Sequence, residues 1–133
     1  MKEDYNGMAE QFKCVADKII DSEEYVSIGL VLYRLALDCR YKAVLVSQNR
    51  FDEMDKHHKL RDLAVKCNIG MPVDILDLLK DDEVFQHTKL KAFAYEGTKA
   101  LGPDTSVQDL ILKGRYIKDR CEEVWQMTAP HIK

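Results

Sequence analysis

The sequence predicts an all-α protein, an up-and-down helical bundle in which short helices bridge between long ones. Apolar residues recur at helical spacing along most of the chain, whereas no segment alternates apolar and polar residues as a half-buried strand would. The 133 residues include only three prolines and no low-complexity tract. This length suffices for one hydrophobic core, so we expect a single helical-bundle domain spanning residues 1–133.

The central helix is predicted between Tyr25 and Ser47, the longest apolar stretch with helical character. On a helical wheel it has a broad apolar arc and one narrow polar stripe, and only the stripe is expected to face water. Charged residues four apart within the stripe should form weak ion pairs along the helix. The stripe consists of Ser27, Arg34, Asp38 and Lys42.

The opposite side of this helix carries small residues at Gly29, Ala36 and Ala43, spaced by seven. Small side chains at this spacing let a neighbouring helix come close. Arg40 points the same way, and a guanidinium among apolar residues needs a carboxylate or another polar partner, or a place at a subunit or ligand interface. We favour an internally paired arginine, and we treat all four residues as candidate binding or interface positions.

Residues 8–20 are predicted to form a first helix that packs antiparallel to the central one. Its apolar residues follow the spacing of one helical face: Met8, Phe12, Val15, Ala16, Ile19 and Ile20. In the short connection that follows, Asp21 or Ser22 can cap the next helix. The bundle therefore begins as an αα-hairpin.

A polar segment, 48–58, separates this hairpin from a short helix predicted over 60–67. Two further helices are expected, a short one around 75–79 and one of about four turns between 81 and 102. The last long helix is predicted over 106–125.

Gly114 lies on the apolar side of the last predicted helix. It is a second position where a small residue permits close packing. We expect it to receive the central helix near Gly29 or Ala36.

Composition limits the classes of function. The formal charge of −3 argues against a surface that attracts nucleic acid or anionic membrane over its whole extent, although it allows a local basic patch. The N-terminus has no apolar core typical of a signal peptide, and the central helix carries charges inside it, so we expect no membrane span. The four cysteines, with no C-x-x-C pair, are predicted to be buried free thiols in a reducing cytoplasm.

No motif for metal or nucleotide chemistry is present in the sequence. Di-iron bundles use Glu-x-x-His pairs, and the chain has none. It also has neither a Walker loop nor G-x-G-x-x-G. We therefore expect no cofactor and no metal site.

The polar segment contains the candidate catalytic residues, Arg50 and His57. An arginine can stabilise a phosphorane-like charge while a histidine moves a proton, which is the minimum for metal-independent RNA cleavage. The neighbouring acidic residues would oppose a phosphate site, and His58 could simply bond the start of the next helix. We favour this structural interpretation and keep His58 as a candidate binding residue.

The order of elements resembles the HEPN superfamily, helical-bundle proteins of toxin-antitoxin pairs, phage defence and RNA processing. The run 33–45 resembles the long second helix of that family, and 58–63 resembles the H-x-L-x-x-L that commonly follows it. Ribonucleolytic members carry Arg, four to six residues, then His, usually in a later helix and often followed by x-Tyr. Here Arg50 and His57 have that spacing in an earlier loop, and position 59 is a lysine.

The resemblance, with this departure from the catalytic motif, implies a non-catalytic HEPN-like binding or regulatory module acting through a protein partner or RNA. One alternative is a metal-independent HEPN-type ribonuclease, a toxin or defence effector. Another is a helical adaptor or immunity protein. The family's habit of pairing, together with Arg40 beside the small-residue positions, leads us to expect a homodimer or a helical protein partner.

Overall fold

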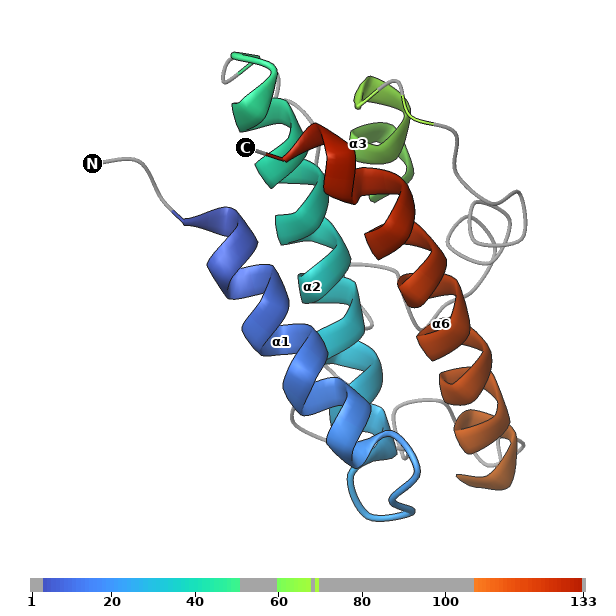
Figure 1. The fold of residues 1–133 in the computed structure, drawn as a ribbon. Helices are drawn as coiled ribbons and strands as arrows, with labels where there is room; N and C mark the ends of the chain where they lie inside the picture. The colour runs from blue at the N-terminus through green and yellow to red at the C-terminus, as the bar shows by residue number, and fades with distance from the viewer. Residues whose placement is uncertain (1–3, 51–59, 68, 70–106, 133) are drawn as a thin grey trace.

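The fold was obtained as a computed structural model that describes residues 4–50, 60–67, 69 and 107–132 (Figure 1). These residues form helices and turns, and among them no residue is in a strand. The prediction of an all-α protein is therefore confirmed. The helices predicted around 75–79 and between 81 and 102 lie outside the described residues.

The four described α-helices have different positions in the bundle. α1 and α6 lie on either side of α2, and α3 lies beside the C-terminal ends of α2 and α6 (Figure 1). A short 3-10 helix, η4, follows α6 directly. The bounds are Tyr5–Ile19 for α1, Val26–Ser47 for α2, Leu60–Lys66 for α3, Val107–Thr128 for α6 and Ala129–His131 for η4.

α2 is the central helix, as predicted. Fourteen of its 22 residues are buried, against two of the 15 residues of α1, so α2 supplies most of the core. α3 and α6 complete that core from the other side. Its largest fully buried side chains include Leu30, Tyr33, Leu37, Val44, Leu63, Leu110 and Ile117.

Ile20, the C-cap of α1, joins the three long helices. A Cβ atom added to Gly29 of α2 would lie 2.9 Å from Ile20 Cδ1, and one added to Gly114 of α6 would lie 2.6 Å from Ile20 Cγ1. Both distances are shorter than carbon contacts allow, so a larger residue at either position would force the same Ile20 side chain to shift. The expectation that Gly114 receives α2 directly is corrected, because Ile20 lies between the two helices.

The prediction that only the polar stripe of α2 faces water is wrong. Ser27 and Arg34 are buried, Arg34 at 7% exposure, whereas the most exposed side chains of α2 are Ile28 at 43% and Leu35 at 39%. The expected ion pairs within the stripe are present, and they offset the cost of burying the Arg34 charge. Asp38 lies 3.5 Å from Arg34 Nη1 and 2.9 Å from Lys42 Nζ, so the stripe carries its own counter-charge.

The connection between α1 and α2 uses its polar residues differently from the prediction. Ser22 Oγ accepts from the Tyr25 N–H at 3.3 Å and closes the turn, while Tyr25 itself is the N-cap of α2. Asp21 accepts from Arg115 Nε at 2.7 Å instead of capping α2. The loop is thus joined to α6.

Burial corrects two predictions for the first helix. Cys39, Cys67 and Cys121 are buried and none forms a disulfide, as expected, but Cys14 is exposed. Val15, placed on the apolar face by the sequence, is also 46% exposed. Because α1 lies at the edge of the bundle, α2 and α6 cover only part of its circumference.

Candidate functional site

Arg50, a sequence-predicted catalytic candidate, lies just after α2 and joins the ends of two helices. Asn49 has a φ of 58°, and the Arg50 N–H donates to the Leu45 carbonyl at 2.9 Å, as in a Schellman C-cap. The Arg50 guanidinium donates to Gln48 Oε1 at 3.0 Å and to the Lys66 carbonyl at the end of α3. Its charge therefore lies at a helix C-terminus, where a cation is stabilising.

His57, the candidate partner of Arg50 in catalysis, and His58, a candidate binding residue, lie outside the described residues. The pairing of Arg50 with His57 and the binding role of His58 therefore stay predictions. The Cys67 thiol lies close enough to Arg50 for the charge of the arginine to act on it. Burial raises the pKa of this thiol to about 12, against an opposing effect of the Arg50 charge, so the thiolate form is scarce at neutral pH.

Arg40 is internally paired, the alternative that the sequence favoured. Its Nε donates to Thr128 Oγ1 at 2.7 Å, its Nη1 to Asn6 Oδ1 at 2.7 Å, and its Nη2 to the Trp125 carbonyl at 2.9 Å. The guanidinium carbon also lies 4.6 Å from the centre of the Trp125 ring, and Glu10 lies 3.4 Å from Nη1. Arg40 thus connects α1, α2 and α6 through one cation.

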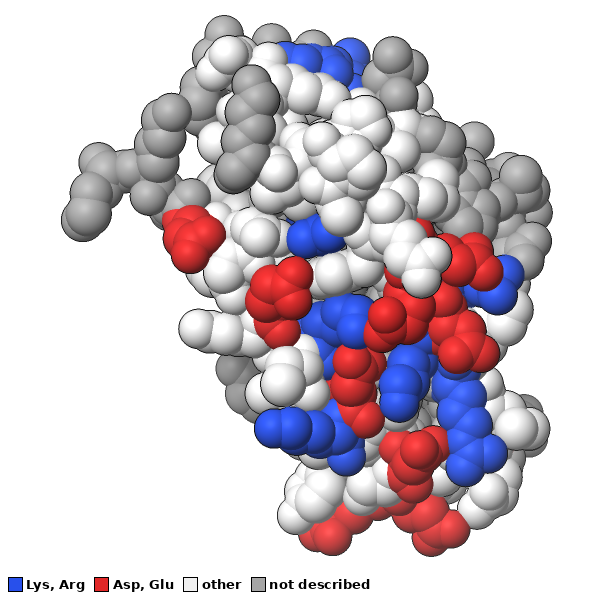
Figure 2. Space-filling view, viewed as in Figure 1, with Lys and Arg blue, Asp and Glu red and all other residues white. Residues whose placement is uncertain are grey.

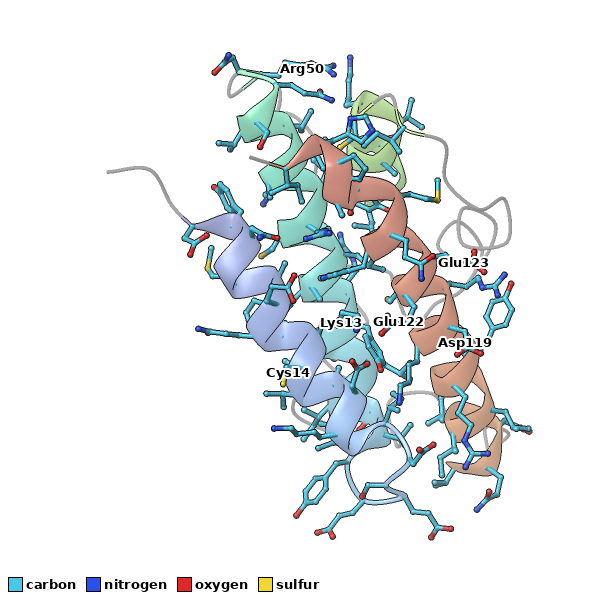
Figure 3. All side chains as sticks on the ribbon, viewed as in Figure 1. Lys13, Cys14, Arg50, Asp119, Glu122 and Glu123 are labelled. Atoms are coloured by element: carbon cyan, nitrogen blue, oxygen red, sulfur yellow. The ribbon has the colours of Figure 1, made fainter. Side chains whose placement is uncertain are left out.

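Next to Arg40, charged residues of α1 and α6 and the Trp125 indole bond one another in a group that we call the α1–α6 network. Its members are Glu10, Lys13, Asp17, Glu122 and Trp125 (Figure 3). Lys13 bonds both Asp17, at 2.9 Å, and Glu122 of the opposite helix. Burial by itself would lower the Lys13 pKa, but the bonds to Glu122 and Asp17 outweigh it and raise that pKa.

The α1–α6 network also reaches α2 through a buried tyrosine. Tyr33 donates its hydroxyl to Asp17 at 2.5 Å, and burial together with this bond raises the Tyr33 pKa well above its usual range. Figure 2 shows the resulting concentration of both charge signs between α1 and α6. Positive and negative groups alternate there, so this surface has no excess charge of one sign to attract a polyanion.

A surface hollow of about 470 Å³ lies beside the network. Two pairs of its polar groups bond each other: Glu10 accepts from Trp125 Nε1 at 2.9 Å, and Asn6 Oδ1 accepts from Arg40 Nη1 at 2.7 Å. Within the residues described, no three His, Cys, Asp or Glu side chains are grouped to hold a metal ion. The hollow is lined by Asn6, Glu10, Arg40, Trp125, Gln126, Ala129 and Ile132.

The other side of α1 and α2 is apolar, and we call it the α1–α2 apolar face. Three of its side chains are substantially exposed: Val15 at 46%, Ile28 at 43% and Leu35 at 39%. Phe12 and Ile19 are partly exposed beside them. The face consists of Met8, Phe12, Val15 and Ile19 of α1 and Ile28, Leu32 and Leu35 of α2.

Helical spacing places both halves of this face on one side of the hairpin. In α1, Ala16 and Ile20 pack inward, and the residues of the apolar face lie about a quarter-turn from them around the helix axis. Lys13 and Asp17 lie on the opposite side of the helix. In α2 the residues at 28 and 35 likewise lie away from Tyr33 and Arg40, which contact α1 and α6. The cation–π contact of Lys42 with Tyr5, at 5.7 Å, bridges the two helices near the end of this face.

The positions of labelled residues agree with this two-sided arrangement. Lys13 and Glu122 point toward each other between α1 and α6, whereas Cys14 lies on the side of α1 away from α6 (Figure 3). Arg50 lies at the far end of α2, and Asp119 lies on the outer side of α6 (Figure 3). Among the residues that the structure describes, Arg50 therefore lies at a different end of the bundle from the pair Lys13 and Glu122.

Sequence reasoning missed the residues of the α1–α6 network and of the exposed face. Lys13 and Asp17 are four apart, which indicates an ion pair but not that Glu122 completes it. Ile28 and Leu35 border the polar stripe on the helical wheel. Their place beside the stripe is the feature of the sequence that could have predicted their exposure. Gly29, Ala36 and Ala43 are all buried within the chain, and Gly29 lies against Ile19 and Ile20 at the end of α1.

The chain matches no protein-family model, no curated protein and no solved structure. Its resemblance to the HEPN superfamily accordingly stays a prediction. Over the part of the chain that the structure describes, no helix has both the length and the apolar character needed to cross a membrane.

Proposed function

We propose that this protein is a non-catalytic, HEPN-like binding or regulatory module that acts through a protein partner at its α1–α2 apolar face. The observation that carries the proposal is the exposure of Val15, Ile28 and Leu35 on adjacent helices. Single exposed apolar residues are normal, but several of them on the same side of two adjacent helices favour a protein interaction site. The residues of the face carry no charge, so a partner can cover them without desolvating ions.

The directions of the pKa shifts also support binding over catalysis. A general acid or base works best with a pKa near the operating pH. Here burial raises the pKa of Tyr33, Tyr41, Cys67 and Cys121, and carboxylate bonds raise that of Lys13, so each of these groups moves away from neutrality. Arg50, for its part, bonds groups at the ends of α2 and α3.

The alternatives are a metal-independent HEPN-type ribonuclease that uses Arg50 and His57, and an adaptor or immunity protein of the same shape. RNA is the alternative partner. The buried cysteines suit a reducing compartment, which is why we propose a cytoplasmic location.

A site-specific crosslinking experiment tests the proposed face. A photoreactive amino acid is placed at position 35 and, as a matched control, at position 112, because Leu112 is also an exposed leucine, at 63%, but lies on α6. After irradiation in cells that express each variant, we expect a discrete protein adduct from position 35 and none from position 112. Equal labelling from both positions, or none from position 35, contradicts the proposal.

A nuclease assay separates the main alternative. In the presence of a chelator, the purified protein should leave single-stranded and structured RNA uncut. Cleavage that is lost in both Arg50→Gln and His57→Ala would establish the ribonuclease instead. If the RNA stays intact, a filter-binding titration at two salt concentrations detects an RNA-binding module by its salt-dependent affinity.

A further inference from the structure

The surface hollow beside the α1–α6 network contains polar groups that keep unused hydrogen-bonding capacity. We propose that this hollow binds a neutral carboxamide, a group that offers a carbonyl oxygen and an N–H to the same surface. The described residues that line it come from α1, α2, α6 and the turn after α6, and none of them belongs to the α1–α2 apolar face. The site is therefore separate from the proposed partner surface.

Arg40 supplies the donor of the site. A guanidinium has five N–H groups. Within the described part of the chain those of Arg40 make four hydrogen bonds, to Thr128, Asn6, Glu10 and the Trp125 carbonyl. At least one N–H is therefore left for a ligand. Arg40 is only 4% exposed, and a buried donor without an acceptor costs free energy, so an oxygen supplied by a ligand is stabilising there.

Glu10 supplies the acceptor. Its Oε1 accepts from Trp125 Nε1 at 2.9 Å and from Arg40 Nη1 at 3.4 Å. No described residue donates to the second oxygen, Oε2, and the side chain is 55% exposed. A ligand N–H can therefore bond Oε2 while both bonds of Oε1 stay in place.

The charges of the hollow favour a neutral ligand. Arg40 and Glu10 are the charged residues among those that line it, and their charges cancel. A carboxylate would meet the Glu10 carboxylate and an ammonium would meet the Arg40 guanidinium, so like-charge repulsion opposes both. The pKa of Arg40 is lowered because burial outweighs the attraction of Glu10. One further oxygen dipole, without a charge of its own, therefore stabilises this cation.

The remaining walls fit the apolar part of such a ligand. The Trp125 indole, Ala129 and Ile132 lie beside the polar groups, and the hollow has a volume of about 470 Å³, within the size range of small-molecule sites. Two hydrogen bonds and a small apolar contact at the protein surface give a weak site, with a Kd on the order of 1 mM for a small amide.

A nuclear magnetic resonance titration of the whole, isotope-labelled chain with isobutyramide tests the site. Trp125 is the only tryptophan of the chain, so its indole N–H gives one side-chain signal that reports on the hollow. We expect this signal to shift in a saturable way. A shift that does not saturate up to about 100 mM, far above the expected Kd, overturns the proposal.

Two probes of the same shape test the chemistry. Isopropyl methyl ketone keeps the carbonyl of isobutyramide but has no N–H, so it should bind about fivefold more weakly, which is the effect of one net hydrogen bond. Isobutyrate carries a negative charge and should bind weaker than the amide by about tenfold or more. Isobutyrate that binds as tightly as the amide, or a ketone that does so, overturns the carboxamide site.

Three variants test its position. Glu10→Gln replaces Oε2 by a donor and should remove the preference for the amide over the ketone. Glu122→Gln, the matched change in the same network but outside the hollow, should keep that preference. Ala129→Phe places a ring into the hollow from an exposed position and should abolish the shift. Circular dichroism verifies the fold of each variant. A shift that survives Ala129→Phe means that the amide binds elsewhere and overturns the proposal.

A last probe distinguishes two sources of the same chemistry. N-acetylalanine N-methylamide represents the main chain of a peptide, whereas isobutyramide represents a primary amide. Tighter binding of the peptide probe supports a peptide segment as the ligand, and tighter binding of isobutyramide supports a primary amide. Failure of both overturns the inference. None of these outcomes affects the adduct expected from position 35, because the hollow and the α1–α2 apolar face have no residue in common.

Discussion

The two sides of α1 differ in how they satisfy their side chains. On the side that faces α6, Lys13 bonds Asp17 and Glu122, and Glu10 accepts from the Trp125 indole. On the other side, Val15 is 46% exposed and has apolar neighbours along the helix. One short helix therefore presents two different surfaces: a polar side whose groups bond α6, and an apolar side on which Val15 is left exposed.

Substitutions on the two sides of α1 should therefore have different effects. Changes on the side of α1 that faces α6, and at the residues beneath it, should alter the free energy of unfolding and leave association unaffected where the fold survives. Changes on the α1–α2 apolar face should weaken association with a partner and leave the free energy of unfolding nearly unchanged.

The largest expected effect is that of Arg40→Ala, which should lower the free energy of unfolding by about 3 kcal/mol. The substitution leaves the Asn6 and Trp125 acceptors without their donor and removes the cation stacked on the Trp125 ring. Urea denaturation followed by circular dichroism measures it. Arg115→Ala is the matched control, because Arg115 pairs with Asp21 in an exposed position and its loss should shift the midpoint little. Equal shifts for the two variants would contradict the central role of Arg40.

Next in size is Gly114→Ala, with an expected loss of about 1–2 kcal/mol, since overpacking outweighs the better helix propensity of alanine. The new methyl group would lie 2.6 Å from Ile20 Cγ1 and 2.7 Å from Cδ1. Ile20→Val removes one of these atoms, so the double variant should lose less stability than the sum of the two single variants. Strict additivity in a double-mutant cycle would show that Ile20 is not the obstacle.

Alkaline pH should lower the free energy of unfolding of the whole domain. The unfolded Cys67 thiol ionises near its ordinary pKa of 9.0, whereas in the folded state that pKa is raised to about 12. The raised pKa values of Cys121, Tyr33, Tyr41 and Lys13 act in the same direction. The folded state therefore binds more protons than the unfolded state above about pH 9, and stability falls as pH rises.

The urea midpoint between pH 7.5 and 11 measures this decline. Tyr33→Phe removes one of the contributing groups and should make the decline above about pH 10 less steep. A midpoint that is constant or rises up to pH 11 would contradict the prediction.

The sequence was sufficient to predict α2 as the central helix, because a long apolar run with few breaks has to be buried. It also predicted that Arg40 needs an internal partner, since the cost of an unpaired buried cation is general. The identity of the partners could not be predicted. Thr128 and Trp125 are more than eighty positions away in the chain, and only the packing of α6 against α2 brings them to Arg40.

The errors have a common physical cause. The helical wheel ranks the faces of a helix by polarity, but burial depends on which neighbours the helix has. Arg34 is buried because Asp38 neutralises it, and Leu35 is exposed because it lies outside the contacts with α1 and α6. The same reasoning explains Cys14 and Val15, which belong to a helix at the edge of the bundle.

The smallest expected effect, and the sharpest test of the comparison, is that of Val15→Gln. Val15 is about half exposed, so the substitution removes little buried apolar area and should change the free energy of unfolding by no more than about 0.5 kcal/mol. The adjacent Ala16 is fully buried against the core, and Ala16→Gln should be destabilising by several times that amount because it places a large amide where no space exists. Urea denaturation followed by circular dichroism measures both variants. A large loss of stability in Val15→Gln would mean that the apolar side of α1 supports the fold, whereas a small loss combined with a lost protein adduct from position 35 would support a role of this side in binding.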